Sequence, residues 1–504
     1  MTKLRMWAAV SVILVAAAAI TIAACGSTSQ SNSLETLTDD LVNELSANYE
    51  VATGYPELYT NADCDYTYAV LKNCVANNPA APYILPIIPT WPNEFSDPAL
   101  QNMLGPTREG TSGTYRLDPR EAIVVFGTLP PAGRYTSLQT YVATRQGSYD
   151  QSSPAYQTLA AQDPAFLNTL FLKLPQNPSR IESFSSVGNA INNVVIDQQS
   201  GASFGTLRFF IITPDAGMDQ AVRSALSQLG VSSADIFTEP VSYTDMHLGL
   251  DMPADDFFTV MRYALPNDPN AGDDWRNTLP LSVLRVRENP SSTRAAQPFP
   301  ISAYDARSAT PEAQYVGDLN DLIGAVCKRW GSCDQPAPLI DVQAPPINDI
   351  GPSCRQIGMN CIADGQDTPY YYSSDLPLDH GEIYAVADTL ATETGNATYV
   401  SIGINDSSKL LGVASVDDPA LKGSAGAYAS TVNNTDKLFV YFLTRNCAGL
   451  ENLTDGKCLS ITNDMVPPGV SIKLSLRDYV FPGTARGPDS AQLLKPTVVR
   501  VSQP

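Results

Sequence analysis

Eight of the nine cysteines fall into four close pairs, and this spacing constrains the fold more than any other feature of the sequence. Eight cysteines allow about 100 pairings, and sequence proximity favours the one in which each cysteine pairs with its neighbour and closes a short loop. Each such disulfide would stabilise the fold by about 2 to 3 kcal/mol. A zinc site is the alternative, but the chain has no Cys-x-x-Cys pair and only two histidines, His247 and His380. We therefore predict disulfides, which form in exported proteins. The predicted pairs are Cys64 with Cys74, Cys327 with Cys333, Cys354 with Cys361, and Cys447 with Cys458.

The ninth cysteine, Cys25, follows a segment typical of secretion signals. Lys3 and Arg5 precede an apolar stretch over residues 7–22, which ends in Ile22-Ala23-Ala24-Cys25. This ending resembles the lipobox of bacterial lipoproteins. The resemblance implies cleavage after residue 24, a diacylglyceryl group on the Cys25 sulfur and a fatty acyl group such as palmitate on the new amino terminus. A membrane-spanning helix is the alternative, but the stretch is shorter than the about 20 residues that spanning needs.

The polar residues 25–33 after the signal predict a flexible tether to the membrane. Removing residues 1–24 takes away two basic residues and no acidic one, so the formal net charge changes from −21 to −23. A chain this acidic is a poor partner for nucleic acid or for anionic lipid head groups. We expect an extracytoplasmic protein, lipid-anchored at Cys25 to the cell membrane or the outer membrane.

Hydrophobic periodicity predicts an α+β fold that is mainly β, with a few packed helices. Residues 33–48 predict a helix with Leu34, Leu37, Leu41 and Leu45 on one face, and residues 310–330 predict another. Strands 122–127 and 134–141 flank Pro130-Pro131-Ala132-Gly133, which predicts a hairpin turn. A strand over 206–213, a helix capped by Asp215 and extended sequence from 235 predict a βαβ-like unit, and two more strands are expected over 257–262 and 281–286.

A proline-rich stretch over residues 335–352 predicts a linker between two domains. The expected domains are residues 34–334, an α+β domain, and residues 353–504. Three segments of the second resemble three of the first in the same order: 382–390 and 121–129, 399–402 and 135–138, and 438–444 and 207–213. This order suggests two β-sandwich-like modules from an internal duplication, in which the loop from Cys447 to Cys458 replaces the helix after Thr213.

The C-terminal half also resembles a known type of module. Residues 474–482 and 494–501, with 397–406 and the strand at 438, are similar to strands of an uncharacterised "domain of unknown function" family, a β-sandwich-like module of exported bacterial proteins. The resemblance covers about residues 370–504 and implies a β fold without supplying a catalytic residue.

Candidate sites for chemistry are few. Gly201-Ala202-Ser203-Phe204-Gly205 matches the Gly-x-Ser-x-Gly pattern of serine hydrolases, in which a strand precedes the serine and a helix follows it. Here a strand is expected after Ser203, and 194–196 predicts another before it, so a hairpin loop is the alternative. A triad would also need His247 or His380 nearby.

Two further candidates concern ligands. Asp268, Asn270 and Asp273 alternate oxygen side chains that could surround calcium, although Leu279 stands where a calcium loop has its glutamate, and an exposed polar turn is the alternative. Tyr66 and Tyr68 flank Cys64, and Tyr370, Tyr371 and Tyr372 precede the second domain's strands, so these rings could form a binding surface or simply pack in the core.

The sequence is compatible with three functions. The first is a non-enzymatic binding or structural lipoprotein of the cell envelope. The second is an anchored hydrolase that uses Ser203 or an acid pair. The third is the solute-binding lipoprotein of a transporter, which would need two α/β lobes around a deep cleft, whereas this chain predicts few long helices.

Overall fold

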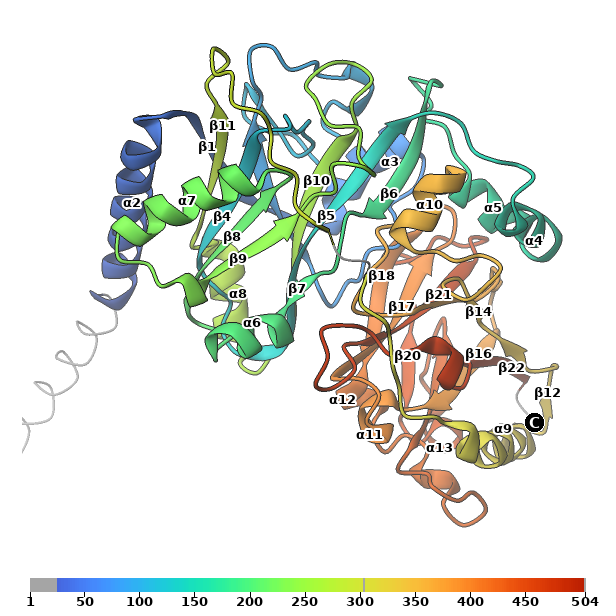
Figure 1. The fold of residues 1–504 in the computed structure, drawn as a ribbon. Helices are drawn as coiled ribbons and strands as arrows, with labels where there is room; N and C mark the ends of the chain where they lie inside the picture. Colours follow the sequence, from blue (N-terminus) through green and yellow to red (C-terminus); the bar gives the residue numbers. More distant parts are fainter. Residues whose placement is uncertain (1–24, 302–303, 503–504) are drawn as a thin grey trace, which may run out of the picture.

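The computed structural model describes residues 25–301 and 304–502, and these residues form two β-rich modules that lie side by side (Figure 1). They contain 12 α-helices and 22 β-strands in three sheets, which confirms a mixed α+β fold that is mainly β. The predicted signal, residues 1–24, lies outside the described residues. None of the described helices is both long and apolar enough to cross a membrane.

The first module is one 11-stranded sheet that folds over on itself, in the order β6-β5-β10-β2-β1-β11-β4-β8-β9. Its two halves enclose an apolar core to which Ile84, Val125, Val142 and Phe210 contribute. The strands are β1 (Tyr49–Tyr59), β2 (Tyr83–Pro89), β3 (Thr111–Ser112), β4 (Glu121–Thr128), β5 (Gly133–Gln146), β6 (Arg180–Ser186), β7 (Ile191–Asn192), β8 (Leu207–Thr213), β9 (Ile236–Pro240), β10 (Asp256–Pro266) and β11 (Leu281–Glu288).

Strand β1 joins the two halves of this sheet. Its residues up to Gly54 pair with β11, and its residues from Tyr55 onward pair with β2. The backbones approach closely at the change of partner, because a Cβ atom at Gly54 would lie 2.1 Å from the carbonyl oxygen of Ile87. Only glycine fits this crossing without a shift of the backbone.

The second module is a sandwich of a six-stranded and a five-stranded sheet around one apolar core. The sheet orders are β12-β22-β16-β19-β20, with β13 also on β22, and β14-β15-β21-β17-β18. The strands are β12 (Ser332–Cys333), β13 (Ala337–Pro338), β14 (Ile340–Asp341), β15 (Tyr370–Tyr372), β16 (Ile383–Thr389), β17 (Tyr399–Asp406), β18 (Leu411–Asp417), β19 (Leu438–Thr444), β20 (Cys458–Ser460), β21 (Ile472–Tyr479) and β22 (Thr497–Ser502).

The two modules have the same strand order. Taking β13 and β14 together as the counterpart of β1, the second module runs β18-β17-β21-β15-β14/β13-β22-β16-β19-β20, which matches the first strand for strand. The parallel pair recurs too, as β8 with β9 and as β19 with β20. The three sequence matches fall on the equivalent pairs β4 and β16, β5 and β17, and β8 and β19, so the duplication is confirmed. We call the modules the first and the second copy.

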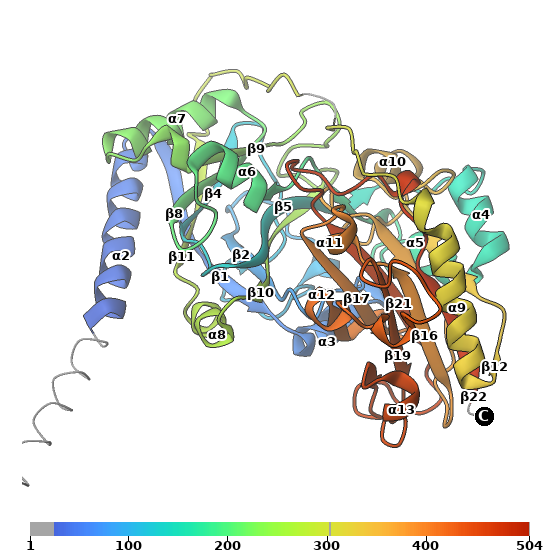
Figure 2. The same ribbon diagram turned by 90° about the horizontal axis from the view of Figure 1, so that it is seen from below.

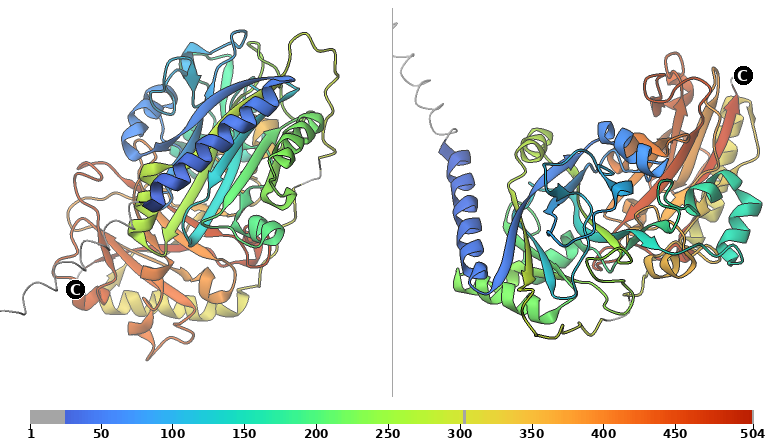
Figure 3. Two further views of the ribbon diagram at one scale, coloured as in Figure 1. Left: turned by 90° about the vertical axis from the view of Figure 1, so that its left-hand side faces the viewer. Right: turned by 90° about the horizontal axis from the view of Figure 1, so that it is seen from above.

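Helices cover equivalent outer faces of the copies. In the first copy, α2 (Cys25–Ser46) and α7 (Ala216–Gln228) pack on β4, β8 and β11 through Leu41, Leu45 and Val222 (Figure 3). In the second copy, α9 (Val316–Trp330) covers β16 and β22 (Figure 2). The connection between the parallel strands β19 and β20 contains the short helix α13 (Glu451–Thr454), which lies inside the Cys447–Cys458 loop. The disulfide loop thus stands where the first copy has α7, as predicted.

Several expectations need correction. Because α9, β13 and β14 belong to the second copy, the break between copies lies in residues 289–312, before α9, and not at the predicted linker 335–352. Residues 25–33, which were expected to form a flexible tether, are helical as part of α2. The turn at 130–133 is no hairpin, since β4 and β5 pair with other strands and lie in different halves of the sheet.

The four predicted disulfides are all present, which indicates an oxidising, extracytoplasmic compartment. Cys64–Cys74 lies between β1 and β2, beside α3 (Cys64–Leu71). Cys354–Cys361 lies at the equivalent place between β14 and β15, beside α10 (Gly351–Ile357). Residues 73–83 and 360–370, which follow these helices, share the pattern Asn-Cys-x-Ala and end in Pro-Tyr, a repeat that the sequence analysis missed.

Each of these two loops reaches across to the other copy. The backbone N–H groups of Cys74 and Ala76 donate to the carbonyl oxygens of Lys409 and Leu410, at 2.7 and 2.9 Å, just before β18. Their counterparts, Cys361 and Ala363, donate to Ser183 and Phe184 of β6, at 2.8 and 2.9 Å. Since β6 and β18 are equivalent strands, the copies exchange matching contacts around an approximate two-fold axis.

Aromatic and guanidinium groups complete the contact between copies. The rings of Tyr135 and Tyr399, which occupy equivalent positions on β5 and β17, lie 6.3 Å apart between their centroids. Within the first copy the buried Arg262 lies over the ring of Tyr83, and within the second the equivalent Arg477 lies over Tyr370, both at 5.4 Å. Arg477 Nη2 also reaches across to the first copy and donates to the carbonyl oxygen of Ala76 at 2.6 Å. The interface is therefore closely packed around these rings, and the two copies are β-rich modules, not the two α/β lobes that the solute-binding alternative needs.

Candidate functional site

Two connections are much longer in the first copy than in the second. Residues 147–179, which carry α4 (Pro154–Gln162) and α5 (Pro164–Leu170), link β5 to β6, whereas residues 407–410 link the equivalent strands β17 and β18. The other connection encloses a pocket. Residues 90–120 link β2 to β4 in the first copy, whereas residues 373–382 link the equivalent strands in the second. We call residues 90–120 the insertion. It packs over one end of the first copy and touches the loop before β10, where the N–H of Phe95 donates to the carbonyl oxygen of Leu250 at 2.8 Å.

An ion pair is present in both copies, and the insertion buries it in the first copy only. Glu121 pairs with Arg285 in the first copy, and at the equivalent positions of the second copy Glu382 pairs with Arg500. The Arg285 side chain is completely buried, but that of Arg500 is 49% exposed. The insertion makes the difference, because Glu94 accepts from Arg285 at 2.5 Å and the guanidinium lies over the ring of Trp91. Burial raises the pKa of Glu121, and the Arg285 charge opposes this shift.

The insertion encloses a pocket of about 440 Å³. Its lining is mostly polar and comes almost entirely from the insertion, with Asp256 of β10 contributing from the sheet. Phe95, which is 37% exposed, supplies an aromatic ring. A pocket of this size can hold a small molecule. We refer to it as the insertion pocket.

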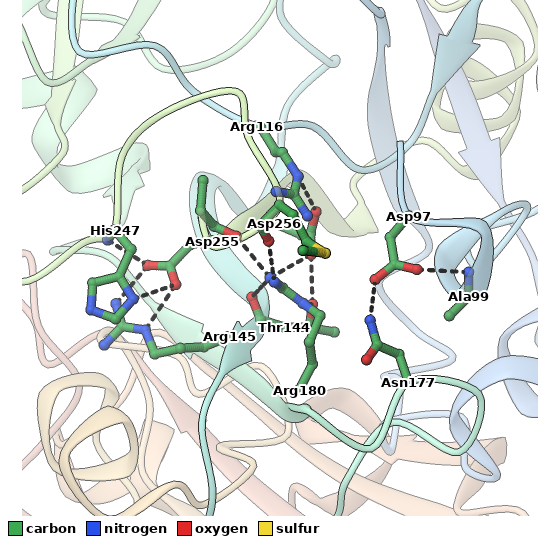
Figure 4. A network of polar contacts seen from close by, with 12 residues as sticks. Asp97, Ala99, Arg116, Thr144, Arg145, Asn177, Arg180, His247, Asp255 and Asp256 are labelled. Atoms are coloured by element: carbon green, nitrogen blue, oxygen red, sulfur yellow. Dashed lines mark hydrogen bonds and ion pairs between the residues drawn. The ribbon is translucent and has the colours of Figure 1, made fainter. Parts of the chain in front are cut away.

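A buried charge network holds the base of the insertion pocket (Figure 4). Asp256 Oδ1 accepts from Arg116 Nε at 3.1 Å, and its Oδ2 lies 2.7 Å from Arg180 Nη2 and from Thr144 Oγ1. Burial raises the pKa of Asp256, and the two guanidinium groups oppose that shift. Because both oxygens of Asp256 are bonded on opposite sides, the network fixes the insertion to β10, β5 and β6.

The neighbouring Asp255 faces the other way, because successive residues at the start of a strand point to opposite sides. Its carboxylate accepts two hydrogen bonds from Arg145, at 2.9 and 2.6 Å (Figure 4). His247 Nδ1 lies 3.6 Å from Asp255 Oδ1, which is too far for a hydrogen bond, and the His247 side chain is 57% exposed. The buried Asp255 carboxylate also accepts from the backbone N–H of His247 at 2.9 Å, so it joins Arg145 to the His247 segment.

A second hollow, of about 550 Å³, lies where the copies meet. Its charged groups are already paired, since Lys422 Nζ lies 2.6 Å from Glu393 and Arg134 lies 4.0 Å from Asp418. These pairs leave few polar groups for a ligand, so the insertion pocket is the stronger candidate.

Ser203 does not lie in a nucleophile elbow. Residues 193–200 form the helix α6 (Asn193–Ser200), not the expected strand, because the Asn192 side chain caps its first turn by accepting from the N–H groups of Val194 and Val195. A helix precedes Ser203 and β8 follows it, the reverse of the hydrolase order. Ser203 is 3% exposed, and His247 lies against Asp255 instead.

The acidic group at Asp268 is a helix start and not a calcium loop. Asp268 caps α8 (Pro269–Thr278), accepting from the N–H groups of Asn270 and Ala271. Asp273 pairs with Arg276 at 3.1 Å one turn along the same helix. Among the described residues one other group has a metal-like arrangement, Asp349 with Cys354 and Cys361, but both of its sulfurs are joined in a disulfide.

The tyrosines proposed as a binding surface separate into two groups. Tyr370, Tyr371 and Tyr372 form β15 inside the second copy and are at most 6% exposed, so they pack in the core and bind nothing at the surface. Tyr66 on α3 is 44% exposed. Tyr68 is half-buried, with Lys409 Nζ of the second copy 5.6 Å from its ring centroid.

Comparisons with known proteins leave the function open. No protein-family model and no curated protein matches the chain. A crystal structure of an uncharacterised protein from Burkholderia cenocepacia is similar over 93% of this chain and 87% of that chain, with 11% identity and a TM-score of 0.38. These values are too low to carry an argument.

Proposed function

We propose that this protein is an extracytoplasmic bacterial lipoprotein, anchored through Cys25, that binds a small molecule in the insertion pocket and catalyses no reaction. The insertion pocket carries the proposal. It is enclosed by residues 90–120, and the equivalent connection of the second copy, residues 373–382, is much shorter, so the pocket belongs to the first copy alone.

The scaffold around the pocket supports binding over catalysis. Both carboxylate oxygens of Asp256 are already paired, one with Arg116 and the other with Arg180, so this carboxylate is not free to act as a general base. The disulfides and the contacts between copies make the body rigid, and a preformed pocket loses less entropy when a ligand binds.

A thermal-shift screen of chemically diverse metabolites tests the binding function. Wild-type protein is compared with Thr114→Trp, which fills the insertion pocket from its half-buried lining. Thr462→Trp, at an exposed site of the second copy, is the control. We expect at least one compound to raise the unfolding temperature of wild type and of Thr462→Trp but not of Thr114→Trp. If no compound of any class depends on the pocket, the proposal is wrong.

The anchor is tested separately by growing cells with an alkyne-labelled fatty acid. We expect the wild-type chain to take up the label and to fractionate with membranes, and Cys25→Ser to lose both properties. Labelling of Cys25→Ser at the wild-type level would contradict anchoring at this residue.

A further inference from the structure

We propose that the ligand of the insertion pocket is a saccharide whose ring packs on Phe95 and whose hydroxyl groups bind the polar lining. This inference rests on the proposed binding function and names the ligand class.

The lining matches the hydrogen-bonding properties of a sugar. Ser96, Gln101, Asn102, Ser112 and Thr114, whose side chains carry hydroxyl or amide groups, line the pocket. Such groups both donate and accept, as sugar hydroxyls do. An apolar ligand would remove these groups from water without replacing their hydrogen bonds, which opposes binding.

Phe95 provides a platform for the ring. The Arg116 guanidinium lies over Phe95, 5.0 Å from its centroid, and the backbone bond to Leu250 holds the residue in place. The face of an aromatic ring is negative, and it attracts the weakly positive C–H groups on one face of a sugar. The exposed part of Phe95 therefore offers an oriented contact that needs no charge on the ligand.

Asp97 provides a fixed acceptor in the wall. Its Oδ1 accepts from the N–H of Ala99 at 2.9 Å, and its Oδ2 accepts from Asn177 Nδ2 at 2.8 Å. Each oxygen keeps a second lone pair, and a carboxylate accepts from hydroxyl groups more strongly than a neutral oxygen does. The buried side chain cannot turn away, so it can select hydroxyl positions.

Arg108 lies at the rim and could extend recognition to acidic sugars. Its guanidinium stacks on Tyr55, 3.8 Å from the ring centroid, while the residue remains exposed. A uronic acid would place a carboxylate within the reach of this cation. Neutral and uronic-acid oligosaccharides are therefore separate arms of the test.

The experiment uses the lipidated full chain in a detergent without a sugar head group. Arrayed neutral and uronic-acid oligosaccharides are screened first, and the best one is then measured by calorimetry. We expect Phe95→Ala to weaken binding about tenfold and Asp97→Asn, which retains a side-chain oxygen for the cap, to weaken it about fivefold or more. Tyr243→Ala removes an aromatic side chain that is 41% exposed and lies outside the pocket lining, and it should change affinity less than about twofold.

The outcomes separate this inference from the proposed function. Arg108→Gln should weaken the binding of acidic saccharides and leave the binding of neutral ones unchanged. If only neutral saccharides bind to the wild-type protein, the ring contact with Phe95 is still supported. The inference is overturned if no saccharide binds, or if Phe95→Ala binds as tightly as Tyr243→Ala while its unfolding temperature is unchanged. If a compound of another class binds to the wild-type protein but not to Thr114→Trp, the proposed binding function is still supported. If Thr114→Trp abolishes the binding of no compound, both proposals are wrong.

Discussion

Asn73 and Asn360, equivalent residues of the two copies, donate to the same oxygen atom. Their Nδ2 atoms each lie 3.3 Å from Oε2 of Glu182, a buried residue of β6. The two disulfide loops therefore meet at one carboxyl group. Burial raises the pKa of Glu182 from 4.5 to about 8, and the two amide hydrogen bonds only partly oppose this.

We predict that Glu182 makes the fold less stable as the pH rises. Between about pH 4.5 and pH 8 the folded chain keeps a proton that the unfolded chain has lost, so this contribution is complete below pH 4.5 and is lost as the pH approaches 8. The slope is at most about 1.4 kcal/mol per pH unit. Denaturant unfolding at pH 5.5 and 8.5 should show a larger loss in wild type than in Glu182→Gln. The exposed Glu109→Gln is the control, and equal losses in all three proteins would contradict the prediction.

Removing the disulfide Cys64–Cys74 should loosen the contact between copies. Replacing both cysteines with alanine should cost about 2 to 3 kcal/mol of unfolding free energy. Because Ala76 donates to Leu410 of the second copy, hydrogen exchange in residues 75–77 should become faster. Removing Cys447–Cys458, which closes a loop within the second copy, should leave exchange in residues 75–77 as it is in wild type. Equal acceleration by both changes would show that the first loop has no special role between copies.

Gly54→Ala and Gly324→Ala should have opposite effects. At Gly54 the new methyl group would meet the carbonyl oxygen of Ile87 at 2.1 Å, so β1 must shift, and we expect a loss of about 2 kcal/mol or more. Gly324 lies on the exposed side of α9 with no atom within 4 Å of a new Cβ, so alanine should stabilise the protein by up to about 1 kcal/mol. Thermal unfolding measures both changes, and tolerance of alanine at Gly54 would contradict the close crossing of β1 and β2.

Asp256→Ala should be strongly destabilising. It leaves Arg116 and Arg180 buried without their shared partner, which costs about 3 to 5 kcal/mol. Asp273→Ala breaks a pair with Arg276 in which the carboxylate is 68% exposed, and its effect should stay below about 1 kcal/mol. Chemical denaturation of the two variants measures the difference. Similar small effects would mean that the network does not hold the insertion in place.

Only part of the candidate site could be predicted from the sequence. Asp255 and Asp256 stand out as acidic residues before a strand, but nothing local indicates that they face opposite sides or meet different arginines. Arg116 lies 140 positions from Asp256, and neither Arg116 nor Arg180 was identified from the sequence. The repeated Asn-Cys-x-Ala pattern at Asn73 and Asn360 is visible in the sequence, and a search for repeats around cysteines would have found it.

The sequence by itself determined the local elements and the disulfides, because both depend on residues close together in the chain. The leucine face of α2, the strands β4, β8 and β16 and the four neighbouring cysteine pairs follow from periodicity and loop length. Only the tertiary structure decided that α9 belongs to the second copy, that the Tyr370 segment is core and that the insertion forms a pocket. Burial and charge pairing depend on distant segments that meet in space, and no local pattern encodes those meetings.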